Sequence, residues 1–427
     1  MARIHHKDIG KRKISKNQSQ AKKKREKVVV LVLEKRETLL QSVLGRNDAW
    51  PKILAEAEPM APRGDSKPAA RYLTKPLPPP RWAQPQEPLH LTSTAHEDLV
   101  TQAEAILRTF LVNYNYDSIS NFIDLYDAHV KAKKPLYDLY QKYLPPIRRR
   151  KYTCVGLGME LIQKWRQLDK KFPGFATATA LLSCEEAVDD VTDYVMMGEV
   201  PDSVEYAEKE HVLVGVQVVI DGRPGIMLAD PGYHVARIIT VMSDRAYPHT
   251  GWFTKSDEPQ CRKDYEYSFN PHNSNYIEWH ERVTRGHVVK YQTSLIYAAQ
   301  PYLDSIYVTE KRNLVYNFRS LLSRDPKGNL KAGMYFPVGV RTKDASFTIF
   351  SDIGMEKRKT KYKFSAFTDP DNVDPLVVEE IERCSVQMRY KKRALLQTIS
   401  KLAKIMSNQS FINQTLEIND DICRMSL

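Results

Sequence analysis

The feature that most constrains the fold is a change of hydrophobic pattern at residue 211. The run "HVLVGVQVVI" at 211–220 is rich in β-branched residues, which favour strands. The turn sequence "DGRPG" follows at 221–225, and a second apolar run, "IMLAD", follows at 226–230. Two apolar runs joined by a short glycine-containing turn predict a β-hairpin. We therefore expect the centre of the chain to form a sheet.

The register of this hairpin depends on the length of its turn. If residues 221–222 are the central pair of the turn, Asp230 lies opposite Leu213, which shares a face of the sheet with His211. His211 and Asp230 are then diagonal neighbours, with Cβ atoms about 7 Å apart. If all five residues of "DGRPG" form the loop, Asp230 faces the other side of the sheet, unless a bulge at Gly215 restores the facing. The sequence leaves both registers open.

Helical spacing dominates before the hairpin and again near the end of the chain. The segment 92–114 has apolar residues at helical spacing, with Thr92 or Ser93 as a candidate N-cap. Shorter helices are predicted at 118–130 and 135–144, and another from Cys154 to about 171. After the hairpin, strands are predicted at 236–242, 265–269, 287–298, 313–319, 333–340 and 346–352, followed by one amphipathic helix at 375–406. This order predicts an α+β fold with an N-terminal helical subdomain, an antiparallel β-sheet or barrel subdomain and a C-terminal helix.

Composition divides the chain into four parts. We expect a basic tail with a short helix at 1–50, a Pro-rich linker at 51–94, one folded domain at 95–355, and a C-terminal linker with an amphipathic helix at 356–427. The linker prediction rests on "KPLPPPRWAQPQEP" at 75–88, which favours polyproline II over a packed element.

The net charge of +12 is concentrated in the tail. Residues 1–27 contain eleven Lys or Arg and two acidic residues, so they carry nine of those charges. The clusters "KRK" at 11–13 and "KKKR" at 22–25 are typical of a bipartite nuclear-localisation signal, which would bind an import receptor. The alternative is that residues 11–27 bind nucleic acid or other polyanions non-specifically. The protein is therefore expected in the nucleus or the cytoplasm.

Cysteine usage and hydropathy exclude several classes. Five cysteines in 427 residues show no paired spacing, so the sequence predicts neither a disulfide framework nor a zinc site and favours a reducing compartment. No run of about 18 apolar residues occurs, so no interaction with a membrane is expected. The histidines between 234 and 287 lack the spacing of a metal site, so no metal is predicted.

Cys154 is the candidate nucleophile. It stands at the start of a predicted helix, where unpaired N–H groups stabilise a thiolate. His211 begins the first strand of the hairpin and Asp230 ends the second, so an imidazole can hold the thiol proton and a carboxylate can orient the imidazole. Taken singly, the three residues have plainer interpretations as a buried structural thiol, a polar strand-edge residue and a turn residue. The other four cysteines are interpreted as structural or exposed.

The order of these residues resembles the arylamine N-acetyltransferases and the wider transglutaminase-like cysteine fold. The similar stretches are "FPGF" at 172–175, "HVLVGVQVVI" at 211–220 and "LADPGYH" at 228–234. In the last of these, Asp230, Gly232 and Tyr233 match the family's motif. The resemblance covers roughly residues 97–355.

This resemblance implies a papain-like or transglutaminase-like core and a cysteine-dependent acyltransferase. Cys154 would carry the acyl group as a thioester, and His211 and Asp230 would complete a catalytic triad. Gly232 and Tyr233 would line the substrate pocket. Acetyl-CoA is the candidate cofactor, and a small-molecule amine or acyl compound is the candidate substrate.

The residues around Cys154 depart from the family pattern. Lys151 and Tyr152 replace two glycines before the cysteine, and Gly156 and Gly158 replace a glutamate and an asparagine after it. Three alternatives therefore stay open. They are a transglutaminase-like amidase or peptidase, a catalytically inactive binding protein of the same fold, and a nuclear scaffold that associates with nucleic acid through its basic tail.

Overall fold

The computed structural model describes residues 76–147, 152–196, 209–258, 261–340, 342–354 and 356–425. The predicted tail at 1–50, including the basic clusters within 11–27, lies outside the described residues. The same holds for residues 51–75 of the predicted linker. Among the described helices, none combines the length and the hydropathy needed to cross a membrane.

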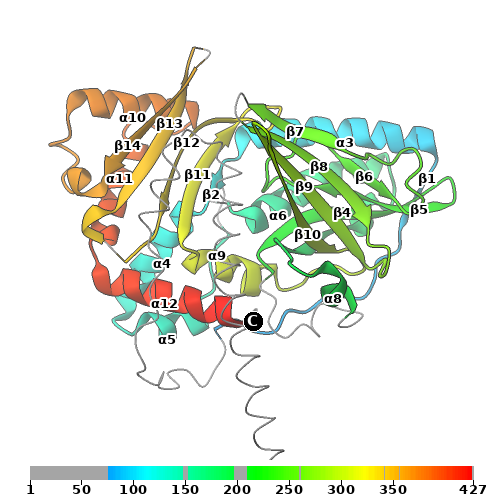
Figure 1. Ribbon diagram of the computed structural model, residues 1–427, viewed down its shortest axis with the longest axis horizontal. Helices are drawn as coiled ribbons and strands as arrows, with labels where there is room; N and C mark the ends of the chain where they lie inside the picture. Colours follow the sequence, from blue (N-terminus) through cyan, green and yellow to red (C-terminus); the bar gives the residue numbers. More distant parts are fainter. Residues whose placement is uncertain are drawn as a thin grey trace, which may run out of the picture.

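The fold is α+β, with two sheets and helices packed against both (Figure 1). The larger sheet has the order β6-β5-β4-β3-β10-β9-β8-β7 and is antiparallel, except that β1 (Leu89–Leu91) pairs with β4 in parallel. It curls, so that β6 approaches β8. The predicted sheet or barrel is thus a curled open sheet. Its strands are β3 (Thr179–Glu185), β4 (His211–Ile220), β5 (Arg223–Ala229), β6 (Ile239–Met242), β7 (Phe253–Glu258), β8 (Cys261–Phe269), β9 (Tyr276–Arg285) and β10 (Val288–Tyr297).

The predicted hairpin is formed by β4 and β5, and its two-residue turn fixes the register. Ile220 pairs with Arg223, so Asp221 and Gly222 are the central residues of the turn. Both have positive φ angles, of 48° and 78°, as a type I′ turn requires. Gly215 pairs with Leu228 in an unbroken ladder, without a bulge. The first of the two predicted registers is therefore confirmed.

The smaller sheet lies beside the larger one and has the order β14-β13-β12-β11-β2 (Figure 1). Its strands are β2 (Tyr116–Asp117), β11 (Phe318–Arg324), β12 (Leu330–Pro337), β13 (Ser346–Ile353) and β14 (Glu356–Lys363). The domain boundary predicted at 355 falls inside the β13–β14 hairpin. Residues 356–363 are therefore a strand of this sheet and not the start of a linker.

Three helices close the C-terminal side, where one was predicted. They are α10 (Pro375–Gln387), α11 (Ala394–Met406) and α12 (Gln409–Met425). The predicted helix at 375–406 breaks between α10 and α11, where Arg389 and Arg393 have positive φ angles of 61° and 63°. A left-handed residue ends an α-helix, so the apolar stripe folds back on itself to pack against the smaller sheet.

The N-terminal helices agree closely with the prediction. They are α3 (Ser93–Asn113), α4 (Ile119–Ala132), α5 (Leu136–Lys142) and α6 (Cys154–Trp165), and the short helices α7 (Phe175–Ala178) and α8 (Val191–Met196) follow. Thr92 caps α3, since its side chain accepts a hydrogen bond from the N–H of Ala95. The strand predicted at 313–319 is wrong at its start, because residues 311–315 form helix α9 (Lys311–Val315) and the strand begins at Phe318.

The second half of the predicted linker is part of the folded body. Leu77 is buried and belongs to the largest apolar cluster, and Arg81 forms two hydrogen bonds of 2.8 and 2.7 Å with the carboxylate of Asp304. The indole of Trp82 donates to Ser183 Oγ at 3.1 Å. Residues 89–91 then form β1. The Pro-rich composition correctly indicated an extended chain, but contacts with distant residues hold this part of it in place.

Gly215 offers a test of this packing, because β4 leaves no room for a side chain there. A Cβ added to Gly215 would lie 2.4 Å from Cδ1 and 2.9 Å from Cγ of Leu182. We expect Gly215→Val to lower the free energy of unfolding by about 1–3 kcal/mol through overpacking. Chemical denaturation measures this change. Gly339→Ala is the matched control, since no atom lies within 4 Å of the added Cβ; a Gly215→Val variant as stable as this control would contradict the packing.

Candidate active site

Cys154 is the first residue of α6, and it is buried. Two glycines bring this helix close to its neighbours. A Cβ on Gly156 would lie 2.4 Å from the ring of Tyr152, and a Cβ on Gly158 would lie 2.6 Å from Leu181 Cδ2. The glycines that distinguish this chain from the family pattern therefore allow α6 to pack tightly against Tyr152 and strand β3.

His211 and Asp230 meet across the open end of the β4–β5 hairpin. His211 Nε2 lies 2.9 Å from Asp230 Oδ2, and both residues are fully buried. Burial alone would lower the pKa of His211. The charge and hydrogen bond of Asp230, together with a hydrogen bond from Cys154, outweigh burial and raise this pKa well above its ordinary value. The imidazole therefore holds a proton readily while it contacts both partners.

Gly232 marks the point where the three side chains meet. A Cβ added to Gly232 would lie 2.7 Å from Cε1 of His211, 3.0 Å from Cβ of Cys154 and 3.3 Å from Oδ1 of Asp230. Only a residue without a side chain fits at this position. The structure therefore brings the three predicted residues together around one backbone position.

Tyr233 stands over the imidazole of His211. The two rings meet edge to face, with centroids 4.7 Å apart. The backbone N–H of Tyr233 donates to Asp230 Oδ1 at 2.9 Å, and its hydroxyl donates to Glu186 Oε1 at 2.5 Å. The N–H of Tyr233 thus fixes the Asp230 oxygen that does not contact His211, and its ring packs against the imidazole.

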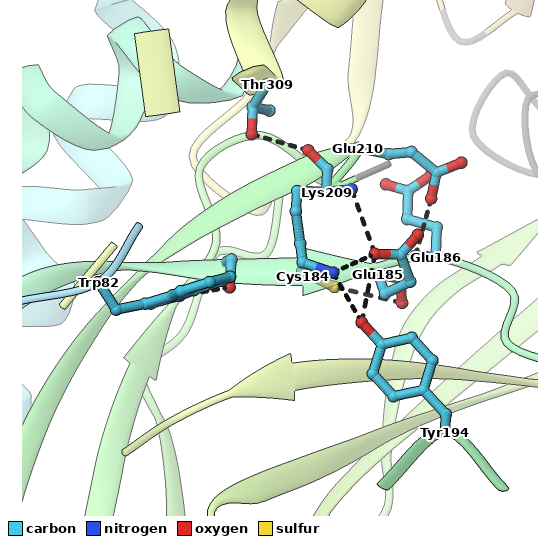
Figure 2. A network of polar contacts seen from close by, with 9 residues as sticks. Trp82, Cys184, Glu185, Glu186, Tyr194, Lys209, Glu210 and Thr309 are labelled. Carbon is cyan, nitrogen blue, oxygen red and sulfur yellow. Dashed lines mark hydrogen bonds and ion pairs between the residues drawn. The ribbon is translucent and has the colours of Figure 1, made fainter. Parts of the chain in front are cut away.

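A buried ion pair holds the segment that leads into His211 (Figure 2). Lys209 Nζ lies 2.9 Å from Glu185 Oε2 and 2.7 Å from the hydroxyl of Tyr194, and the Lys209 N–H donates to the same Glu185 oxygen at 3.1 Å. Thr309 Oγ1 donates to the Lys209 carbonyl at 2.7 Å. These bonds connect the start of β4 to the end of β3 and to the chain near residue 309, so the position of His211 is defined from three sides.

A second buried carboxyl group supports the start of α6. Glu310 accepts hydrogen bonds from Thr153 Oγ1 and from Asn121 Nδ2. Thr153 directly precedes Cys154, so this contact holds the N-terminus of the helix that begins at Cys154. Burial raises the pKa of Glu310 to about 7, although both hydrogen bonds oppose that rise.

Asn313 reaches the sulfur from helix α9, and the sequence did not indicate it. Its Nδ2 lies 3.7 Å from Cys154 Sγ. The fully buried guanidinium of Arg319 donates to the carbonyl oxygens of Asn313 and Leu314, and it lies 4.5 Å from the ring centroid of Phe122. Arg319 therefore fixes the backbone that carries Asn313. No motif marks Asn313, and only the fold brings it to Cys154.

The C-terminal helix supports the same short helix. Arg312, next to Asn313, is buried, and its Nη1 donates to Asn419 Oδ1 of α12 at 3.0 Å. Its guanidinium also lies 4.8 Å from the ring centroid of Tyr316. Residues from the end of the chain thus help to place a residue that contacts the candidate nucleophile.

The loop after Asp230 is held by Arg324 of β11. This buried guanidinium donates to the carbonyl oxygens of Pro231 and Tyr114, and its Nη1 lies 2.7 Å from His234 Nδ1. Burial lowers the pKa of Arg324 to about 9, so the group remains charged at neutral pH. The "DPGYH" loop is therefore fixed from the smaller sheet.

Cys154 and His211 line a pocket between the two sheets. Its free volume is about 100 Å³. Aromatic and apolar side chains from the smaller sheet form much of its wall, and Glu186 and Glu210 lie on the side of β3 and β4. The predicted pocket residues Gly232 and Tyr233 both line it. The remaining lining residues are Tyr116, Ser118, Ala187, His234, Arg312, Asn313, Tyr316, Phe318, Ser320 and Leu322.

The other cysteines do not join this cluster. Cys184, Cys261, Cys384 and Cys423 are buried, and burial raises the pKa of the thiols of Cys184 and Cys384. Within the described ranges, no group of three or more His, Cys, Asp or Glu side chains is placed to hold a metal ion.

No family model, curated protein or solved structure matches this chain.

Glu310 gives a pH-dependent prediction. A carboxyl group whose pKa rises from 4.5 to about 7 on folding favours the folded state below pH 4.5, and this contribution disappears as the pH rises through 7. Glu310→Gln does not titrate, so its stability relative to the wild type should increase between pH 5 and 8, by up to about 3 kcal/mol. Denaturant unfolding at several pH values measures this difference. Glu379→Gln, at an exposed position of α10, is the control; parallel pH profiles for the wild type and Glu310→Gln would contradict the assignment.

Proposed function

We propose that the protein is a cysteine-dependent acyl-transfer enzyme in which Cys154 is the nucleophile, His211 the general base and acid, and Asp230 the residue that orients the imidazole. The observation that carries this proposal is the 2.9 Å contact between His211 Nε2 and Asp230 Oδ2, in a cluster where Cys154 forms a hydrogen bond with the same imidazole and lines a pocket. A buried structural thiol needs neither the imidazole nor the pocket.

The proposed reaction begins with the transfer of the Cys154 proton to His211. Because Nε2 of the imidazole is bound to Asp230, Nδ1 is the nitrogen left to face the sulfur. The thiolate attacks the carbonyl carbon of the acyl donor, and a carbon–sulfur bond forms. The bond to the leaving group then breaks, and the leaving group takes the proton from His211. The acyl group remains on Cys154 as a thioester.

In the second half-reaction an amine attacks the thioester. His211 accepts the proton of the amine as the new carbon–nitrogen bond forms, and the carbon–sulfur bond then breaks to regenerate Cys154. Atoms and electrons balance without an oxidant or a reductant. Water in place of the amine would give hydrolysis, so the same residues support an amidase when the pocket admits water as the acceptor.

Two donors are available for the oxyanion that forms in both steps. One is the backbone N–H of Cys154, because the first N–H groups of a helix have no partner within the helix. The other is Asn313 Nδ2, which lies 3.7 Å from the sulfur. Such donors are worth about 3–4 kcal/mol each in enzymes that use them. Their position near Cys154 favours acyl chemistry over a simple redox or binding role for the thiol.

The resemblance to the arylamine N-acetyltransferases supports acetyl-CoA as the first donor to test and a small-molecule amine as the first acceptor. It also supports a papain-like or transglutaminase-like description of the core. Both are parts of this proposal.

An activated Cys154 should react selectively with a thiol reagent. At pH 6 we expect iodoacetamide to label Cys154 faster than the other four cysteines, which are also buried. His211→Ala should slow the labelling of Cys154 by about a hundredfold, since general-base assistance is lost. Most of the difference in rate between Cys154 and the other cysteines should then disappear. Mass spectrometry of digested protein measures each rate, with Cys154→Ser as the control for assignment. Similar labelling of all five cysteines in the wild type would overturn the proposal.

Asn313 should matter for acyl transfer but not for alkylation. On incubation with acetyl-CoA, intact-mass measurement should show an adduct of about 42 Da that is lost in Cys154→Ala. Asn313→Ala should slow adduct formation by about a hundredfold, because an oxyanion donor is lost. Labelling by iodoacetamide, which forms no oxyanion, should change far less. Equal losses in both reactions would instead assign Asn313 a structural role.

A further inference from the structure

His234 adopts an unusual conformation beside the proposed active site. It follows Tyr233 in the loop after Asp230 and has a φ angle of 63°, in the left-handed region that glycine occupies without strain. Its side chain is 3% exposed. Strained residues that are this well buried are concentrated at sites of function, since the surrounding structure must hold them in place.

The bond with Arg324 determines which nitrogen of His234 carries the proton. Arg324 Nη1 lies 2.7 Å from His234 Nδ1, and a guanidinium can only donate. Nδ1 therefore accepts, and Nε2 carries the hydrogen. Burial, followed by the charge of Arg324, lowers the pKa of His234 well below its ordinary value, so the imidazole is neutral. Nε2 is buried and has no hydrogen-bond partner in the described part of the chain.

An unpaired donor of this kind is costly unless a ligand satisfies it. A buried polar group without a partner costs about 1–3 kcal/mol. His234 Nε2–H has a fixed tautomer and is polarised by a cation on the opposite nitrogen, so it is prepared to donate to an oxygen atom. The residue lines both the pocket that contains Cys154 and a second, adjoining pocket.

Lys255 supplies a positive charge to the same second pocket. Its side chain is partly buried, and burial lowers its pKa to about 8. Among the residues that the structure describes, its ammonium group has neither a hydrogen-bond partner nor an ion-pair partner within reach. The neighbouring Lys263, in contrast, lies 3.4 Å from Glu281. The second pocket therefore contains two donors that lack partners, one charged and one neutral.

The size of the second pocket limits what it can hold. Its free volume is about 40 Å³, whereas one water molecule needs about 10–15 Å³ on the same measure. The pocket therefore accommodates a group of the size of a carboxylate or phosphate and not a larger ligand. Tyr233 and His234 line both pockets, so the two pockets adjoin at these residues.

The geometry points to an anion-binding subsite in this second pocket. We infer that Lys255 and His234 Nε2–H bind a carboxylate or phosphate group carried by the substrate that reacts at Cys154. This inference rests on the proposed function of Cys154 for the identity of the reacting end. The anion site itself depends only on the two donors. Asn329 and Ser256 also line the pocket and add polar groups around such an anion. Glu258 lines the same pocket, and its carboxylate opposes an anion, whereas Lys263 adds a second positive charge to the lining.

Matched alkylating reagents test the subsite in the full-length protein. N-(carboxyalkyl)iodoacetamides, the corresponding phosphonates and neutral carbamoyl analogues would be compared over a series of chain lengths. At one length we expect the charged reagent to label Cys154 about tenfold faster than its neutral analogue, as one charge-assisted contact allows. The better of the carboxylate and the phosphonate identifies the class of anion.

The ratio of the two rates is measured in each variant, so that changes in the reactivity of Cys154 itself cancel. Lys255→Met and His234→Gly should both reduce the ratio to about one. The glycine also relieves the backbone strain at residue 234, so we expect the His234→Gly variant to fold. Lys290→Met, at an exposed position of β10, should retain the wild-type ratio. A wild-type ratio of one at every chain length, or an unchanged ratio in both test variants, would overturn the inference.

A second measurement separates this inference from the proposed function. If the neutral reagents label Cys154 no faster than the other cysteines, the proposed nucleophile is wrong, but the anion site can still be measured. Inorganic phosphate or acetate should then raise the midpoint of thermal unfolding relative to chloride at equal ionic strength and pH 7. The rise should be lost in Lys255→Met and His234→Gly. Equal midpoints in all of these salts would exclude the site.

Discussion

The site depends above all on the register of the β4–β5 hairpin. A two-residue turn with both φ angles positive sets this register, and a slip of one residue would turn every side chain of a strand to the opposite face. In the observed register, Asp230 follows the last paired residue of β5 and reaches the imidazole at the start of β4. The convergence of His211 and Asp230 is thus decided eight to eleven residues away, at residues 221 and 222.

Buried charged and polar groups then hold each element that carries a residue of the site. Lys209 fixes the start of β4, Glu310 the start of α6, Arg319 the backbone of α9, and Arg324 the loop after Asp230. Removing such groups from water is expensive, and well-packed apolar residues often stabilise a protein as much. These four groups share a location. Each forms a hydrogen bond with an atom that lies within two residues of a residue that lines the pocket or contacts Cys154. The buried charged and polar groups therefore position the residues of the site, whereas the apolar clusters stabilise the fold.

The sequence predicted those parts of the structure that follow from local chemistry. The hairpin, the helix that starts at Cys154 and the cap at Thr92 depend on turn residues, periodicity and short side chains, which can be read from neighbouring positions. Contacts between distant segments decided the rest. Asn313 reaches the sulfur only because Arg319 holds its backbone, and the run at 313–319 was predicted as a strand from composition alone. Similarly, the composition of residues 77–91 could not reveal the ion pair with Asp304 or the pairing of β1 with β4.

The bond between Arg312 and α12 has a consequence for how the protein is made. Asn419 lies more than two hundred residues after Cys154 in the chain, yet its side chain helps to place the helix that carries Asn313. During translation the hairpin and the helix that begins at Cys154 leave the ribosome long before this support exists. Domains fold as units when their distant contacts become available. The pocket wall therefore takes its final shape on the nascent chain only after α12 has emerged, so the surroundings of Cys154 are complete only in a polypeptide that has been translated through residue 419.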